Sequence, residues 1–120
     1  MVALTQAQNE AIVKLMLLAR YQDKKLSLTE EAQFNQYLNE LNWQAVTAVD
    51  TYAMRETTVV RKALDSAEST QVFIAQQNQV LDSQDAKNAA LAMVERLLSS
   101  DGVVDAENQF LQQLKTSLNA

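Results

Sequence analysis

Apolar residues recur along the chain at the three- and four-residue intervals that place them on one face of a helix. The first such stretch predicts a helix from about Thr5 to Gln22. Its apolar surface is wide, so we expect this helix to contact more than one neighbour. The inward positions of this helix are Ile12, Leu15, Met16 and Ala19, flanked by Val13, Leu17 and Leu18.

The same spacing predicts further helices over the rest of the chain. Residues 55–58 include β-branched side chains that fit poorly in a helix interior, so we expect a bend or a short break there. The predicted inward positions are Phe34, Tyr37, Leu38 and Leu41 in a second helix that ends near Asn42; Val46, Val49, Ala53, Val59, Val60, Ala63 and Leu64 in the middle segment; Val72, Phe73 and Val80 in a short helix over 70–81; Ala89, Ala90, Met93, Val94, Leu97 and Leu98 in the helix after residue 85; and Phe110, Leu111, Leu114 and Leu118 in a last helix from 105 to about 118.

The composition agrees with a helical fold, because the 120 residues include no proline and a single glycine. A chain of this length is expected to form one domain over residues 1–120 and to remove roughly two-thirds of its unfolded surface from water. No disulfide is required or possible, since there is no cysteine. We therefore predict an all-α fold, a single compact bundle of about six or seven helices.

The single glycine, Gly102, lies between two helical patterns in an acidic stretch. A glycine can adopt the left-handed conformation that ends a helix without a steric penalty from Cβ. Asp105 can then cap the next helix by accepting a hydrogen bond from a backbone N–H group. This turn places three carboxylates, those of Asp101, Asp105 and Glu107, near the start of one helix.

A similar arrangement occurs near the other end of the chain. Residues 28–34 match residues 104–110 in character: an apolar residue, a cap, any residue, Glu, any residue, Gln and Phe. Each copy follows an apolar helix and an aspartate, Asp23 in the first copy and Asp101 in the second. We interpret the match as an internal repeat, which places a helix-turn-helix hairpin at each end of the chain.

The repeated order of apolar helix, acidic turn, cap, Glu and apolar position, around a helical middle that includes Trp43, resembles the TerB-like (tellurite resistance) family. The resemblance covers residues 11–41 and 89–118, and the middle in its helical character only. It implies a small all-helical domain whose two halves bring the acidic residues of both turns close together. It also implies a divalent-metal role for that acidic cluster.

The residues that the resemblance implies as ligands are Asp23 and Glu31 in the first turn and Asp101 and Glu107 in the second. The first turn departs from the family pattern, because Lys24 stands in place of glycine and two residues are inserted. Ca²⁺, Mg²⁺ or Mn²⁺ would accept such oxygen ligands, and Asp105 beside the second turn is a fifth candidate ligand, whereas a usual zinc site would lack its His and Cys. The alternative is that these carboxylates, with that of Asp105, are caps and first-turn acids favoured by the helix macrodipole.

The net charge of -5 argues against nucleic-acid binding and against an anionic membrane surface, since both need clustered cations. The sequence has no pattern typical of a secretory signal and no apolar run long enough to span a membrane, so we expect a cytoplasmic protein. Without His or Cys, the usual general base and thiol nucleophile are missing. We therefore expect a protein that is not an enzyme.

These observations predict a cytoplasmic accessory or interaction domain whose partners are other proteins. The setting in tellurite or metal stress is implied by the TerB-like resemblance alone. Two alternatives stay open at this point. One is a divalent-cation-binding protein that uses the acidic turns, and the other is a helical partner-binding module whose carboxylates are purely structural.

Overall fold

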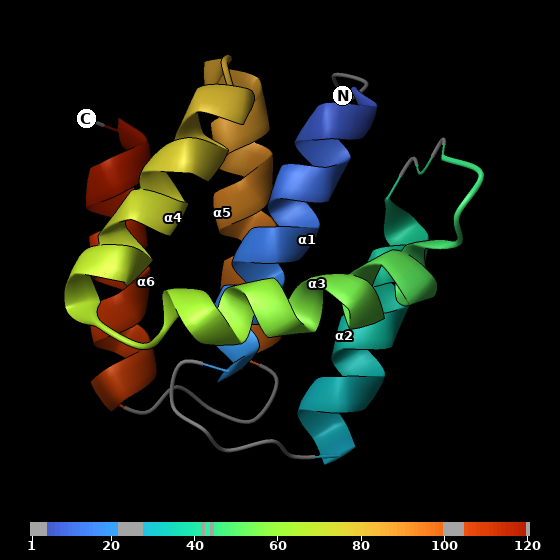
Figure 1. Cartoon of the computed structure of the whole chain (residues 1–120), viewed down its shortest axis with the longest axis horizontal. Coiled ribbons are helices and arrows are strands. Elements are labelled where there is room, and N and C mark those ends of the chain that lie inside the picture. Colours follow the sequence, from blue (N-terminus) through green and yellow to red (C-terminus); the bar gives the residue numbers. More distant parts are fainter. Residues whose placement is uncertain (1–4, 22–27, 42, 44, 100–104, 120) are drawn as a thin grey trace.

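Six α-helices and no strand are found in the described part of the chain, which in this computed structural model comprises residues 5–21, 28–41, 43, 45–99 and 105–119. The helices are α1 (Gln6–Tyr21), α2 (Leu28–Glu40), α3 (Val49–Ala63), α4 (Ala67–Val80), α5 (Gln84–Ser99) and α6 (Asp105–Asn119) (Figure 1). The predicted all-α bundle is therefore confirmed. Over the residues described, none of these helices is long and apolar enough to cross a membrane.

The helix α1 is central to the bundle and packs against each of the other five helices. Its apolar residues from Ala11 to Ala19 are all buried, so the predicted contact with more than one neighbour is confirmed. The start of α1 is fixed by a capping box. The Gln8 N–H donates to Thr5 Oγ1 (3.1 Å), and the Thr5 N–H donates to Gln8 Oε1 (3.0 Å).

The two ends of the chain lie against each other, which agrees with a pair of packed hairpins. Both α1 and α2 pack against α5, and α6 packs against α5 and α1. An ion pair joins α5 to α2, with distances of 3.2 Å from Arg96 Nη1 to Glu40 Oε1 and 3.3 Å from Arg96 Nη2 to Glu40 Oε2. Residues 22–27 and 100–104 lie outside the described residues, so the internal repeat in these turns stays a prediction.

The helix α3 runs across α1 and α2 (Figure 1) and is continuous through residues 55–58. The short break predicted there is wrong. Thr57 Oγ1 donates a hydrogen bond to the carbonyl of Ala53 one turn earlier (3.0 Å), so the hydroxyl is satisfied inside the helix. The propensity cost of a β-branched residue is about 0.5 kcal/mol, and burial of Ala53 and Val60 in the core offsets it.

The predicted inward positions are confirmed in the helices at both ends of the chain and are partly wrong in the middle. The described residues predicted to face inward from α1, α2, α5 and α6 all belong to the core or pack against it. In the middle, four predicted inward valines are exposed: Val46 (107%), Val59 (47%), Val72 (52%) and Val80 (37%). Their neighbours Val60 and Phe73, also predicted to face inward, are buried at 0% and 6% exposure.

Candidate functional site

The five acidic residues predicted to bind a metal lie outside the part of the structure that describes side chains. Asp23 and Asp101 are not among the described residues. The backbone of Glu31 belongs to α2 and that of Asp105 and Glu107 to α6, but the side chains of these three residues are not described. The last helix begins at Asp105, as the sequence predicts. Among the side chains that are described, no group of three or more acidic residues is arranged to hold a metal ion. The metal site stays a prediction.

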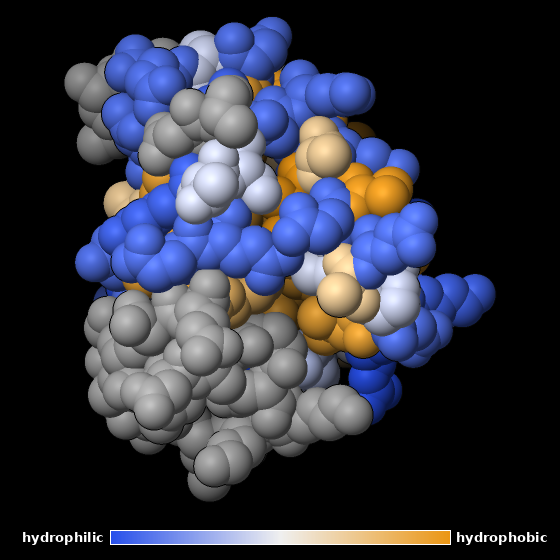
Figure 2. Space-filling model, turned by 90° about the vertical axis from the view of Figure 1, so that its left-hand side faces the viewer, coloured by the Kyte–Doolittle hydropathy of each residue, from blue (hydrophilic) through white to orange (hydrophobic). Residues whose placement is uncertain are grey.

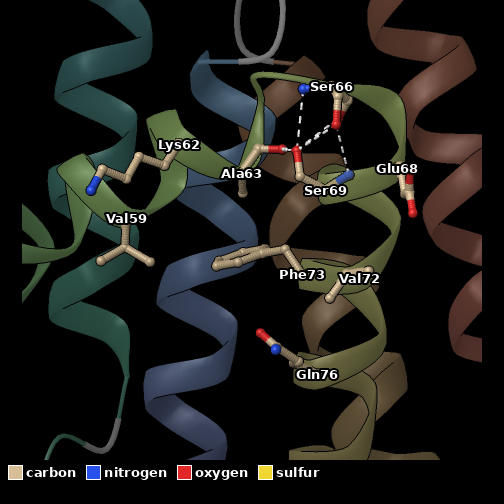
Figure 3. A pocket seen from close by; sticks show the side chains of 9 residues that line it. All are labelled: Val59, Lys62, Ala63, Ser66, Glu68, Ser69, Val72, Phe73 and Gln76. Carbon is tan, nitrogen blue, oxygen red and sulfur yellow. Dashed lines mark hydrogen bonds between the residues drawn. The ribbon is translucent and has the colours of Figure 1, made fainter.

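An open groove lies where the end of α3 meets the start of α4 (Figure 3). Its volume is about 450 Å³. Phe73 and Ala63 are buried and form its floor, and Val59 and Val72 form its walls and are about half exposed. The other lining residues are Lys62, Ser66, Glu68, Ser69 and Gln76. The groove is therefore apolar at its centre and polar at its rim.

Hydrogen bonds fix the corner between α3 and α4 and so preform the groove. Ser66, the N-cap of α4, accepts a hydrogen bond at Oγ from the Ser69 N–H (3.0 Å), and Ser69 Oγ accepts from the Ser66 N–H (3.1 Å). The hydroxyls of Ser69 and Thr70 also reach the Ala63 carbonyl, at 2.7 and 2.9 Å. Carbonyls at the end of a helix have no partner within it, so these two side chains both close α3 and begin α4.

Two opposite charges lie on the two sides of the groove. Figure 3 shows Lys62 of α3 pointing away on one side and Glu68 of α4 pointing away on the other, with Phe73 between them. Both residues are exposed, and neither forms an ion pair within the described part of the chain. Lys62 lies in the last turn of α3 and Glu68 in the first turn of α4, where the helix macrodipole favours each charge.

Other apolar residues are exposed outside the groove. Met54 on α3 is 76% exposed, and Val80 at the end of α4 is also exposed. Figure 2, which views the side where α4 and α6 lie, shows orange apolar side chains reaching the surface among blue polar ones. Single exposed apolar residues are common on proteins, but a concave apolar cluster with a polar rim is typical of a binding site. The α3–α4 groove is therefore the candidate functional site.

Sequence reasoning missed this groove, although the signal is present in the sequence. Val59 and Val60 are adjacent apolar residues, and so are Val72 and Phe73. Adjacent positions on a helix are about 100° apart, so at the edge of a buried face one residue of such a pair can face the core while the other turns away from it. Two pairs of this kind on consecutive helices predict an apolar corner at the surface.

Several arginines lie over aromatic rings and contribute to packing between helices. Arg96, paired with Glu40, has its guanidinium carbon 4.3 Å from the centroid of the Tyr37 ring. The other contacts of this kind are Arg20 with Phe34 (5.3 Å), Arg20 with Tyr21 (5.6 Å) and Arg61 with Tyr21 (5.6 Å). Cation–π contacts at exposed sites contribute about 0.5 to 1 kcal/mol each, so these side chains have a structural role.

Tyr52 on α3 has a buried hydroxyl that forms no hydrogen bond within the described part of the chain. Burial, followed by the carboxylates of Glu56 and Glu10, raises the pKa of this phenol well above its ordinary value of about 10. Trp43 packs on the ring, with the two centroids 5.1 Å apart. Both rings pack against the hydrophobic core, so Tyr52 is a packing residue.

Comparisons of the chain with protein-family models, with curated proteins and with solved structures found no match. The TerB-like resemblance therefore rests on the residues of the two turns and the helices around them.

Proposed function

We propose that the chain is a non-enzymatic interaction domain that binds an amphipathic helix of a protein partner in the α3–α4 groove. The observation that carries the proposal is the exposure of Val59 and Val72 on either side of buried Phe73. A helix that places an apolar side chain in the groove would cover both valines. Removing a half-exposed valine from water contributes about 1 kcal/mol for each side chain.

The charges beside the groove would set the direction of the bound helix. An acidic residue of the partner fits near Lys62, and a basic residue fits near Glu68. Exposed ion pairs of this kind contribute about 0.2 to 1 kcal/mol, so they select an orientation more than they raise the affinity. The hydroxyl of Ser66 and the amide of Gln76 lie at the rim, where they can hydrogen-bond to polar groups of the partner.

The TerB-like resemblance supports the same role and adds a setting, that of a cytoplasmic accessory domain in tellurite or metal stress. The absence of His and Cys from the sequence agrees with a protein that is not an enzyme. Divalent-cation binding by the acidic turns is the alternative. On that alternative, Ca²⁺, Mg²⁺ or Mn²⁺ raises the melting temperature of metal-stripped protein, and an Asp101→Asn, Glu107→Gln double variant loses the rise. No rise with any of the three ions would leave these residues as caps.

Selection from a displayed library of helical peptides tests the proposed function. The natural chain should enrich amphipathic helices, and Val72→Asp should lose them because it places a carboxylate in the apolar centre of the groove. Gln71→Asp is the matched control, since it adds the same charge to the same helix at an exposed position outside the groove. Enrichment that survives Val72→Asp, or no enrichment at all, would overturn the proposal.

A further inference from the structure

We propose that a second copy of this chain covers the α3–α4 groove, in a two-fold symmetric dimer in which Lys62 of each copy pairs with Glu68 of the other. The inference rests on the proposed function, because it names the partner that the groove binds. It follows from the way in which apolar and charged residues are distributed across the groove.

A two-fold interface uses the same surface on both copies, so this surface must be complementary to itself. If one residue contacts a second residue of the other copy, the second residue also contacts the first one of the other copy. The groove has this property. Val59 and Lys62 lie on one side of Phe73, and Val72 and Glu68 lie on the other side (Figure 3). An axis that passes beside Phe73 therefore brings Val59 of each copy against Val72 of the other copy. It also brings Lys62 of each copy against Glu68 of the other copy.

The second copy also supplies what the rim lacks. Lys62 and Glu68 are exposed and form no ion pair within the described part of the chain, and in the dimer each gains a partner of opposite sign. An unrelated partner would need an apolar centre with one cation and one anion at matching positions on its two sides. The chain itself presents that arrangement.

The dimer is expected to be weak. The groove is a small part of the surface, and two copies that each carry a net charge of -5 repel each other at long range. Small interfaces of this kind are typical of transient complexes, so we expect a dissociation constant of about 10 to 1000 μM. The charges at the rim are expected to affect association strongly, because each contact occurs twice in the dimer.

Sedimentation velocity of the full chain tests the inference. Over a range from about 10 μM to 1 mM, the average mass should rise from that of a monomer toward that of a dimer. Lys62→Glu places a carboxylate against Glu68 twice in each dimer, and Glu68→Lys places two ammonium groups together twice. Each variant alone should weaken the dimer about tenfold.

A mixture of the two charge variants is the decisive sample. In the mixed dimer, one contact joins the two introduced charges and the other joins the native Glu68 to the native Lys62. Both contacts are attractive, so the mixture should sediment as a dimer at concentrations at which each variant alone is a monomer. Restoration of this kind is specific to a two-fold contact between these two positions.

The controls make the same changes of charge outside the groove. Arg55→Glu matches Lys62→Glu on the exposed side of α3, and Asp85→Lys matches Glu68→Lys, because Asp85 also lies in the first turn of its helix. Each control should leave the dissociation constant within about twofold of the natural value. Circular dichroism of every variant checks that it is folded, and Val72→Ala, which keeps the charges, should weaken the dimer about threefold.

A chain that stays monomeric up to about 1 mM overturns the inference. The peptide selection described above would still decide the proposed function, because it does not depend on self-association. A dissociation constant that is unchanged in both charge variants also overturns the inference. A mixture of the two variants that does not form the dimer overturns it as well, since either result places the interface elsewhere.

Discussion

The central helix α1 and the α3–α4 corner are built from similar apolar residues but use them in opposite ways. Leu15 and Met16 of α1 are 0% exposed, whereas Val59 and Val72 at the corner are 47% and 52% exposed. The difference follows from their surroundings, because α1 packs against all five other helices while the corner has an open side. Apolar character alone therefore does not separate a core from a binding surface.

The two regions also differ in what their apolar side chains contribute. In α1 the hydrophobic effect stabilises the fold, because the side chains leave water when the chain folds. At the corner a large part of Val59 and Val72 stays in water after folding. Burial of that part is available only when another molecule covers the groove, and this is the physical basis for proposing a binding site at the corner.

Truncation of one residue in each region gives the largest expected contrast. Leu15→Ala should lower the free energy of unfolding by about 3 to 4 kcal/mol, because it leaves a cavity where the side chain is 0% exposed. Val72→Ala should change this free energy by less than about 0.5 kcal/mol, since its side chain is already half in water. Urea denaturation followed by circular dichroism measures both values, and equal losses would contradict the distinction between the two regions.

The sequence predicts α1 better than it predicts the corner, for a physical reason. A helix that is apolar around most of its circumference has to be buried, so the pattern from Ile12 to Ala19 leaves one solution. At the corner, either residue of each adjacent apolar pair could face the core. Only the packing of α3 and α4 decides that Val60 and Phe73 face inward.

The middle of the chain shows a second limit of local patterns. The β-branched residues at 55–58 predicted a break, but the packing of α3 on α1 and the hydrogen bond from Thr57 to the Ala53 carbonyl keep the helix continuous. Local propensity differs by only a few tenths of a kcal/mol between such residues, so tertiary contacts override it. The acidic turns around Asp23 and Asp101 lie outside the described residues, and their metal site stays a prediction.

A smaller effect is expected from loosening the corner itself. Ser69→Ala removes the acceptor for the Ser66 N–H and one donor to the Ala63 carbonyl, and it should lower the free energy of unfolding by about 1 kcal/mol. Thr116→Ala is the control, because among the residues that the structure describes that exposed hydroxyl bonds only to the Gln112 carbonyl of its own helix. Its effect should stay within about 0.5 kcal/mol. Similar losses for the two variants in thermal unfolding would mean that the serine contacts do not hold the corner.

The smallest effect concerns Tyr52, which is on the same helix as Val59 but contributes to the packed side of the molecule. The pKa of Tyr52 is raised by burial and by the carboxylates of Glu56 and Glu10, of which the second lies on α1. The folded chain therefore keeps the phenol proton at a pH at which the unfolded chain, with a pKa of about 10, releases it. The unfolded state then binds fewer protons than the folded state, so the free energy of unfolding falls as pH rises above about 10.

Comparison of the natural chain with Tyr52→Phe isolates this effect. Between about pH 10 and pH 11 the natural chain should lose about 0.5 kcal/mol more than the variant, a value discounted for the partial exposure of the ring. At pH 7 the variant should be at least as stable as the natural chain, because the hydroxyl that it removes is buried without a hydrogen bond in the described part of the chain. Equal pH slopes would show that the Tyr52 hydroxyl is as well solvated as one in the unfolded chain. A loss above about 1 kcal/mol at pH 7 would show that the hydroxyl is bonded to Glu56, which lies one turn later on the same helix.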